Sequence, residues 1–226
     1  MDTVKKDEMN INTSQGEKGL EIERLFTKNL EKPLDAIEYV SRDCVINGTD
    51  GKVVFEMRNC LIPKNWSQVA SDIMISKYFR KAGVPQYDKN GNIKMDSNGK
   101  IELGPEKSAK QVVKRLAGCW RYWGQKYAYF KSNQDAENFE SELQYMLINQ
   151  MAAPNSPQWF NTGLNTAYGI TGPAQGHFYC EPETGELKQS TDAYTHPQPH
   201  ACFIQSIGDN LVNEGGIMDL WVREAR

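Results

Sequence analysis

The pattern of apolar and polar positions first predicts a β-hairpin. Two stretches, 37–46 and 52–62, alternate between apolar and polar residues with the period of two that a half-buried strand requires. The residues between them include Asn-Gly and Asp-Gly pairs, which favour a tight turn. Pairing about that turn places Cys44 opposite residues near Val54 rather than opposite Cys60. We therefore expect no disulfide between these two cysteines.

Apolar residues spaced three or four positions apart predict helices elsewhere in the chain. The stretches with this spacing in the first two thirds of the sequence are 20–30, 65–81, 108–131 and 135–151. The second of these has the clearest end signals, since Asn65 can cap its start, and Gly83 and Pro85 can end it. Its expected inner face consists of Trp66, Val69, Ile73 and Phe79.

Turn residues organise two further stretches. Residues 86–104 contain two Asn-Gly pairs and resemble a hairpin. The stretch 154–200 is rich in proline and glycine, contains all three histidines and has little periodicity. A loop-rich stretch of that length is usually functional, because binding and catalytic groups are often carried on loops.

The end of the chain returns to regular patterns. The string HACFIQSI, at 200–207, predicts a short buried strand. Residues 217–226 predict a helix with Ile217, Leu220 and Trp221 facing inward. The sequence stops within this helix, and we therefore expect the chain to be the beginning of a longer protein.

Composition narrows the class of protein. The 226 residues carry a net charge of -3, which disfavours direct nucleic-acid binding or attraction to an anionic membrane as the main function. No apolar run is long enough to span a membrane, and the first twenty residues lack a secretory signal. Residues 1–18 are polar and predict a disordered tail. The five cysteines, odd in number and irregularly spaced, indicate reduced thiols in a cytoplasmic protein.

One thiol, Cys202, has a position that suits chemistry. It follows a proline-rich turn and begins the predicted strand at the end of the loop-rich stretch. Enzymes of α/β and barrel architecture place reactive groups at such strand ends. A small buried hydrophobic role is the alternative, because that is the commonest role of a single cysteine. Position alone favours the structural role.

Ser156 presents a similar choice. It lies between Pro154 and Pro157, which fix the backbone and leave a short hydroxyl free to meet a ligand. The alternative is ordinary turn chemistry, in which Ser and Asn side chains bond to the nearby backbone. No G-x-S-x-G motif surrounds Ser156, so the sequence does not indicate a hydrolase nucleophile.

A zinc site is a further hypothesis. The candidate ligands, in the order H-x2-C-x15-H-x3-H-x-C, are His177, Cys180, His196, His200 and Cys202. The second histidine pair of a Cys2His2 finger lies on a helix, whereas the prolines between His196 and His200 prevent one here. Loop histidines that contact backbone or substrate are the favoured interpretation.

Several longer strings point to one family. They are PNSPQWFNTGL at 154–164, HPQPHACFIQS at 196–206 and GGIMDLWVREAR at 215–226. Together with WSQVASDIMISKYFRKAGVP at 66–85, they resemble the large class II ribonucleotide reductases, which depend on adenosylcobalamin. The resemblance extends over residues 34–226.

The resemblance implies a mixed α/β fold. A helical N-terminal region with a β-hairpin would precede the start of a ten-stranded α/β barrel, which this chain would contain only in part. The implied division is a tail at 1–18, an N-terminal reductase region at 19–131 and the start of the catalytic barrel at 132–226.

The resemblance also implies a radical mechanism that makes deoxyribonucleotides for DNA synthesis, with ribonucleoside diphosphates as the expected substrates. With adenosylcobalamin as cofactor, a thiyl radical takes the ribose 3′ hydrogen and the 2′ hydroxyl leaves as water. A pair of cysteines supplies the reducing equivalents and ends as a disulfide.

Residue by residue, Cys202 matches the first cysteine of that reducing pair, and it is the catalytic residue that the resemblance assigns. Ser156 and Ala201, together with Cys202, match substrate contacts. The resemblance assigns no metal ligand and no cofactor-binding residue in this chain, and Cys180 has no family role. His196 and His200 belong to a family string, which further weakens the zinc hypothesis.

Other parts of the family's site have no counterpart in the 226 residues. These are the radical cysteine, the second reducing cysteine, the Asn and Glu that assist water loss, and the C-terminal cysteines. We therefore expect the chain to be inactive alone and to require the remaining portion of the reductase, a thioredoxin-like reductant and, as a further expectation, a homodimeric partner. The alternative is a non-catalytic interaction module, with zinc as its ligand.

Overall fold

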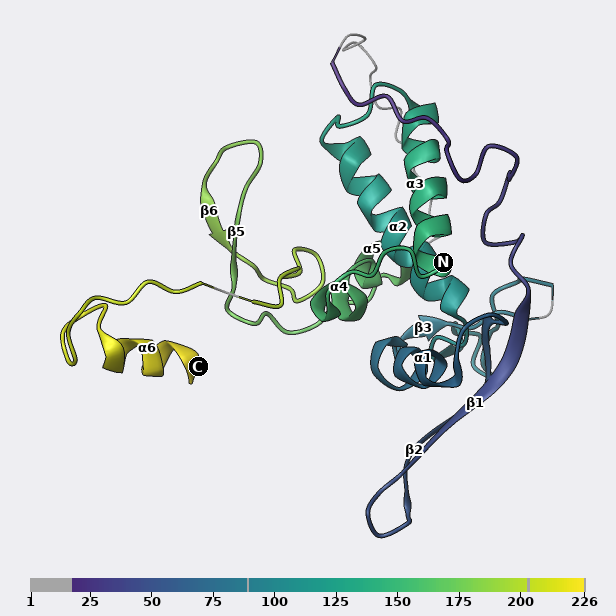
Figure 1. Ribbon diagram of the computed structural model, residues 1–226, viewed down its shortest axis with the longest axis horizontal. Coiled ribbons are helices and arrows are strands. Elements are labelled where there is room, and N and C mark those ends of the chain that lie inside the picture. The colour runs from purple at the N-terminus through teal and green to yellow at the C-terminus, as the bar shows by residue number, and fades with distance from the viewer. Residues whose placement is uncertain (1–17, 89, 203, 226) are drawn as a thin grey trace.

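The computed structural model describes residues 18–88, 90–202 and 204–225 (Figure 1). The predicted tail at 1–18 lies outside the described residues, apart from Lys18. Figure 1 shows a body formed by helices α1 to α5 and the long β1–β2 hairpin. An extended segment separates this body from the C-terminal helix α6.

The predicted first hairpin is confirmed. Strands β1 (Tyr39–Asn47) and β2 (Val53–Pro63) pair antiparallel over nearly their whole length. The register differs from the expected one. The pairing starts with Asn47 opposite Val53, and an irregularity between Ile46 and Asn47 shifts it by one residue, so Cys44 lies opposite Met57 rather than near Val54. Cys44 and Cys60 are both buried and both free thiols.

The predicted helix at 65–81 is shorter and less regular than expected. Helix α1 (Gln68–Ile73) is followed directly by a π-helical turn, η1 (Met74–Tyr78). Ser67 rather than Asn65 caps the start, since its side chain accepts a hydrogen bond from the Ala70 amide. The expected inner face is wrong in part, although Trp66 and Phe79 are buried as expected. The two exposed members are Val69 and Ile73, whereas Met74 and Ile75 are buried.

The hairpin-like region at 86–104 is confirmed in outline. Its base is formed by two short strands, β3 (Val84–Pro85) and β4 (Leu103–Gly104). Isolated bridges continue the pairing, and the turns contain Gly91 and Gly99 at positive φ. The carboxylates of Asp88 and Asp96 accept amide hydrogen bonds within these turns, a role that Asp side chains favour.

The two long helices are also confirmed. They are α2 (Ala109–Lys126) and α3 (Asn133–Ile148), which pack against each other. Ser108 and Ser132 cap their first turns through side-chain oxygens, a role for which serine is favoured. Helix α2 lies in the predicted region 19–131 and α3 in the predicted region 132–226, so the two regions pack against each other through these helices.

The main core lies where these helices meet β2 and α1. Its fully buried apolar residues include Ile62 of β2, Ile75 of η1, Leu116 of α2 and Ile148 of α3. The Trp66 indole donates a hydrogen bond of 2.8 Å to the Ile148 carbonyl and so joins the start of α1 to the end of α3. Burial of these side chains provides the main driving force for assembling the body.

The predicted helix at 20–30 is wrong, because this segment is irregular and is hydrogen-bonded along α3. Its backbone groups find partners on α3 instead of within a helix. The amides of Phe26 and Thr27 both donate to the carboxylate of Glu142, at 3.0 and 2.9 Å. A short helix is marginal in isolation, so these tertiary hydrogen bonds decide the conformation.

The loop-rich stretch contains four short elements. They are α4 (Ser156–Asn161), α5 (Leu164–Tyr168), β5 (Phe178–Cys180) and β6 (Leu187–Gln189). Helices α4 and α5 pack on α2 and the end of η1, whereas β5 and β6 form a small hairpin of their own. Tyr168 and Tyr194 pack with Leu164 and Ile170 in a second, smaller core.

Two expectations for the C-terminal part are wrong. The described residues of the expected strand at 200–207 are irregular and exposed, with Ile204 fully accessible. Helix α6 (Ile217–Glu224) forms as predicted, but its expected inner face is not buried, and Trp221 is 65% exposed. A strand requires a pairing partner and an apolar helix face requires a surface to cover it. The described residues supply neither at these positions.

The fold class is mixed, with helices and small antiparallel sheets, as predicted. The ten-stranded barrel is not confirmed, since the described strands pair only two by two. The domain boundaries stay predictions. Among the described helices, none combines the length and the apolar character needed to cross a bilayer.

Candidate functional site

Ser156 occupies the first position of α4, where its side chain is free to act. The neighbouring Asn155 caps the helix by accepting a hydrogen bond from the Gln158 amide, and Pro157 occupies the first turn. Ser156 is therefore not needed as a cap. Its half-buried hydroxyl lies 3.1 Å from the Tyr78 hydroxyl. The structure thus separates the capping role from the hydroxyl that was predicted to contact substrate.

Tyr78 reaches Ser156 from the last position of the π-helical turn. Its ring contacts Trp159 and Phe160 on the same short helix, with centroids 5.8 and 5.3 Å away. Aromatic pairs at these separations add to the stability of a contact beyond the area that they bury. Segments of π-helix are frequent at functional sites. Tyr78 therefore fixes both the hydroxyl of Ser156 and the face of α4.

A buried ion pair holds the other end of α4. Arg115 and Glu106 are both almost inaccessible, with 2.8 Å between Nε and Oε1. The guanidinium also donates to the carbonyls of Trp159, at 2.8 Å, and Thr162, at 2.7 Å. The last carbonyls of a helix lack partners within the helix, and Arg115 supplies them. The pair therefore anchors α4 to α2.

Glu106 is itself fully engaged. Its Oε2 accepts a hydrogen bond from the Arg80 amide at 2.8 Å, and its Oε1 accepts another from the Tyr168 hydroxyl at 2.8 Å. Burial, followed by the charge of Glu106, raises the pKa of Tyr168 well above its ordinary value. The hydroxyl thus stays protonated and donates. A buried carboxylate with these partners is electrostatically satisfied.

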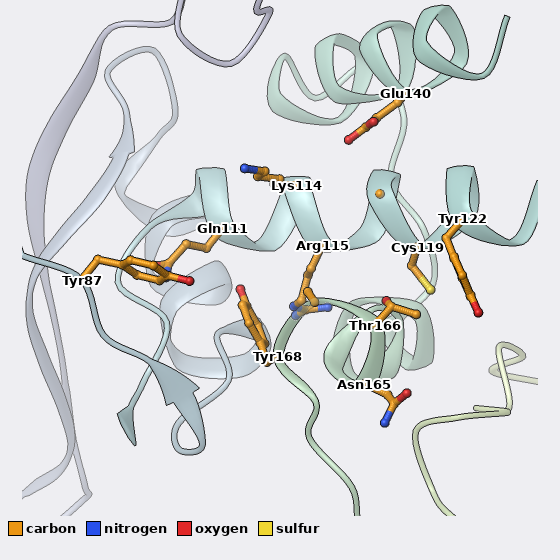
Figure 2. Close-up of a pocket in the computed structure, with 12 residues that line it drawn as sticks. Tyr87, Gln111, Lys114, Arg115, Cys119, Tyr122, Glu140, Asn165, Thr166 and Tyr168 are labelled. Carbon is orange, nitrogen blue, oxygen red and sulfur yellow. The ribbon is translucent and has the colours of Figure 1, made fainter. Parts of the chain in front are cut away.

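A pocket of about 670 Å³ extends beside this network, along α2 (Figure 2). Figure 2 shows α2 crossing the view, with Glu140 of α3 on one side and Asn165, Thr166 and Tyr168 on the other. Tyr87 lies at one end of the group and Tyr122 at the other. The buried thiol of Cys119 lines the same pocket, and burial raises its pKa.

Ala201 and Cys202 lie on a different segment from Ser156. Both are exposed in the irregular chain that leads toward α6. Among the hydrogen bonds of the described residues, none joins that segment to α4. The structure therefore does not bring the three predicted site residues together, and their roles stay predictions. Exposure does leave the Cys202 thiol accessible to a second thiol.

The five zinc candidates do not gather either. Within the described residues, no group of three or more His, Cys, Asp or Glu side chains could hold a metal ion. His196 instead stacks on Tyr179, with centroids 3.7 Å apart, and its carbonyl lies 2.6 Å from Nε2 of His177. Burial is the largest cause that lowers the pKa of His196. These contacts match the favoured interpretation of loop histidines bound to backbone groups.

Sequence reasoning missed the residues that position α4. Arg115 carried a signal, because it falls within the apolar face that Val112 and Leu116 define on α2. A charged residue on a buried face requires a partner, which indicates an ion pair. The partner, Glu106, and the contact from Tyr78 carried no signal in the sequence, because both depend on tertiary structure.

Comparison with known proteins defines the class to which these residues belong. Residues 40–150 match the family model of the class II vitamin B12-dependent ribonucleotide reductases. This match includes the first hairpin, the π-helical turn and both long helices. The hydrogen-bonding partners Tyr78, Glu106 and Arg115 all lie within it.

Individual relatives extend the match beyond the family model. The chain is 53% identical over 224 residues to a vitamin B12-dependent ribonucleotide reductase of Bradyrhizobium diazoefficiens, covering 92% of this chain. It is 52% identical over 223 residues to the corresponding protein of Agrobacterium fabrum, and 31% identical over 194 residues to that of Rhodopirellula baltica. The chain therefore belongs to the vitamin B12-dependent ribonucleotide reductase family and corresponds to an N-terminal portion of it.

The chain spans 18% of the length of the Bradyrhizobium and Agrobacterium relatives. It spans 17% of the Rhodopirellula protein. The predicted resemblance is thus confirmed, and the activity of a whole reductase becomes a matter for proposal.

Proposed function

We propose that this chain forms the N-terminal part of an enzyme that reduces ribonucleotides to 2′-deoxyribonucleotides. The observation that carries the proposal is the identity of 53% to a vitamin B12-dependent ribonucleotide reductase over 92% of the chain. We further propose ribonucleoside diphosphates as substrates and adenosylcobalamin as the form of the cofactor. The products would serve as DNA precursors.

The cofactor would be held elsewhere in the enzyme. The two pockets described along the chain measure about 670 and 410 Å³, which suits a drug-sized molecule rather than a corrin with its nucleotide loop and adenosyl group. The described residues therefore do not fit cobalamin. We derive no step of the reaction through the cofactor.

The role that we propose for Cys202 is that of a reductant. Its thiol and a second thiol, outside these 226 residues, would each lose one electron and one proton and join as a disulfide. The substrate would accept the two electrons and two protons, lose its 2′ hydroxyl as water and gain a hydrogen at that carbon. An exposed thiol suits this role, since disulfide formation needs access to a partner sulfur.

The role that we propose for Ser156 is to orient the substrate, with Ala201 and Cys202 forming an adjoining contact. The Ser156 hydroxyl shares a hydrogen bond with Tyr78 at 3.1 Å, which fixes the direction in which it can meet a ligand. Arg115, paired with Glu106, holds α4, the helix that carries Ser156, against α2. A positioned hydroxyl of this kind contributes by holding the reacting sugar in one geometry.

The proposed setting follows from the same chemistry. A thioredoxin-like reductant would return the disulfide to two thiols after each turnover. We place the enzyme in the cytoplasm, where five free cysteines suit the reducing conditions. We also propose a homodimer as the working assembly.

Reconstitution tests the proposed function. The chain would be mixed with a fragment of the Bradyrhizobium reductase that starts where the aligned region stops, together with adenosylcobalamin, a dithiol reductant and CDP or CTP. We expect dCDP from CDP at a higher rate than dCTP from CTP, with no product when either protein is omitted.

Two cysteine variants make the experiment specific. Cys202→Ser should abolish turnover with a thioredoxin-type reductant, because the disulfide cannot form. Cys180→Ser is the matched control, since Cys180 is likewise exposed and free, and it should retain the activity of the unmodified chain. Turnover that survives Cys202→Ser would disprove the proposed role of this thiol.

A further inference from the structure

The pocket along α2 contains a glycine that the packing of the chain does not explain. Gly118 lies in the middle of α2, where glycine is less favourable than alanine. A Cβ atom at Gly118 would meet only Oε1 of Glu140, at an ordinary 3.7 Å. Gly124 differs, because a Cβ there would lie 2.3 Å from the Phe130 ring. Gly124 is therefore required by packing, whereas Gly118 leaves open space in the pocket.

One end of the pocket is rich in hydrogen-bond donors that have no partner. Lys114 forms no ion pair or hydrogen bond with any residue that the structure describes. Gln111, one turn earlier on α2, uses its Oε1 to accept from the Lys107 amide at 2.7 Å, which leaves its NH2 group free. The hydroxyl of Tyr87 likewise has no hydrogen-bond partner among the described residues. An ammonium, an amide NH2 and a phenol together suit an anion.

Three carboxylates near this end already have cationic partners. Glu140 accepts from Arg121 at 2.9 Å through Oε2 and from Gln144 at 2.9 Å through Oε1. Asp35 pairs with Lys110. Glu106 pairs with Arg115, as described above. Lys114 therefore forms no ion pair with a described residue, and Asp35, on which its charge also acts, is already paired with Lys110. An anionic group in the pocket would give Lys114 a direct partner.

The other end of the pocket has a different character. Around the space at Gly118, its lining includes Cys119, Thr166, Ala167 and the ring of Tyr122, together with Oε1 of Glu140, which already accepts a hydrogen bond from Gln144. The rise of an α-helix puts Gln111 and Tyr122 about 16 Å apart along α2. Figure 2 shows Gln111 and Lys114 toward one end, and Cys119 and Tyr122 toward the other. A ligand that fills this pocket would be elongated, with an anionic head and a flat, largely apolar body.

We propose that the pocket along α2 binds a small aromatic anion, with its anionic group at Lys114 and Gln111 and its ring over Gly118 beside Tyr122. The volume of about 670 Å³ falls within the range of small-molecule sites. This site is separate from the Ser156 hydroxyl and does not depend on the proposed reductase activity.

Calorimetric titration of the 226-residue chain with 1-naphthyl phosphate tests the proposal. We expect binding at one site, at least about tenfold tighter than that of neutral 1-naphthol, since a hydrogen bond to a charged group is worth that factor or more. Inorganic phosphate at the same concentration should not displace the probe, because it lacks the ring. Equal affinity for 1-naphthol, or displacement by phosphate, would overturn the proposal.

Variants locate the bound probe. Lys114→Met should weaken the binding of naphthyl phosphate by about tenfold or more, because the charged contact is lost. The affinity for naphthol should stay unchanged. Lys94→Met is the matched control, since Lys94 is exposed and outside the pocket. Gly118→Leu should fill the space and abolish binding of the probe. Circular dichroism would check that each variant is folded.

Lys114 is an exposed side chain, so its removal should not affect folding. This makes Lys114→Met the decisive variant if Gly118→Leu fails to fold. Unchanged affinity for naphthyl phosphate in Lys114→Met would show that the anionic group is not held there and would disprove the assignment.

Discussion

The body of the molecule and its C-terminal part differ in how far they bury large apolar residues. In the body, Ile75 and Leu116 are fully buried in one core. After residue 200, the described large apolar side chains are mostly exposed, including Ile204 and Trp221. Helix α6 has a clear apolar face, yet none of its residues is buried. The body therefore buries its large apolar side chains against one another, whereas those of the C-terminal part require a further surface to cover them.

Two residues with proposed roles, Ser156 and Cys202, lie on opposite sides of this division. Ser156 lies in the body, where Tyr78 and the Arg115–Glu106 pair fix its position. Cys202 lies in the exposed segment, where the described residues provide no such support. The described contacts thus fix the position of the proposed substrate contact Ser156, whereas they do not fix that of the proposed redox thiol Cys202.

Breaking the buried ion pair should have the largest effect on the body. Arg115→Met leaves Glu106 as an uncompensated buried carboxylate, which we expect to cost about 3–5 kcal/mol of unfolding free energy. Chemical denaturation followed by circular dichroism measures this loss. Because α4 depends on Arg115, the Ser156 region should become protease-sensitive at the same time.

Two further variants show whether the effect comes from the buried charge. Lys64→Met removes an exposed ion pair with Glu38 and should cost less than about 1 kcal/mol. The double variant Arg115→Met, Glu106→Gln removes both charges and should recover part of the loss. A loss no larger for Arg115→Met than for Lys64→Met would show that the buried pair does not stabilise the body.

Truncating one large apolar side chain in each part sharpens the comparison. Leu116→Ala should destabilise the chain by about 2–5 kcal/mol, because it leaves a cavity in the main core. Trp221→Ala should change stability by less than about 0.5 kcal/mol, because the side chain is 65% exposed and belongs to neither buried core. Similar losses for the two variants would contradict the division of the molecule into two parts.

The same division explains what sequence reasoning could predict. The β1–β2 hairpin and helices α2 and α3 were predictable, because local periodicity, turn residues and Ser caps all favour the same elements there. The helix expected at 20–30 fails because Glu142, more than a hundred residues away, binds the backbone amides of Phe26 and Thr27. Long-range hydrogen bonds of this kind leave no local pattern.

The candidate site was predictable only as single residues. Ser156 was identified from its flanking prolines and from the family resemblance, but the contact with Tyr78 depends on a π-helical turn that periodicity cannot reveal. Burial of the strand around Cys202 was wrong for a different reason. An apolar string predicts burial only where another element can cover it, and no described element does so.

A smaller effect, in the alkaline range, tests the burial of the body's thiols. Burial is the largest cause that raises the pKa of Cys44 from 9.0 to about 11. Between these values the unfolded thiol ionises while the folded thiol stays protonated, so this contribution to stability is complete below pH 9 and lost as pH rises to 11. Denaturation curves across this range should show a smaller loss for Cys44→Ala than for the unmodified chain.

Cys180→Ala provides the comparison from outside the body, because Cys180 is exposed. The Cys180→Ala variant should lose as much unfolding free energy over the same pH range as the unmodified chain does. A loss in Cys44→Ala that matches the unmodified chain would show that Cys44 ionises equally well in the folded and unfolded states.

Hydrogen–deuterium exchange of the chain alone, followed by mass spectrometry, tests the central contrast most directly. The account predicts slow exchange for amides in 109–148, where α2 and α3 pack on the core. It predicts near-intrinsic exchange in 204–225, including α6, since a short helix without tertiary packing is marginal in water. Protection of 204–225 comparable to that of 109–148 would contradict the account.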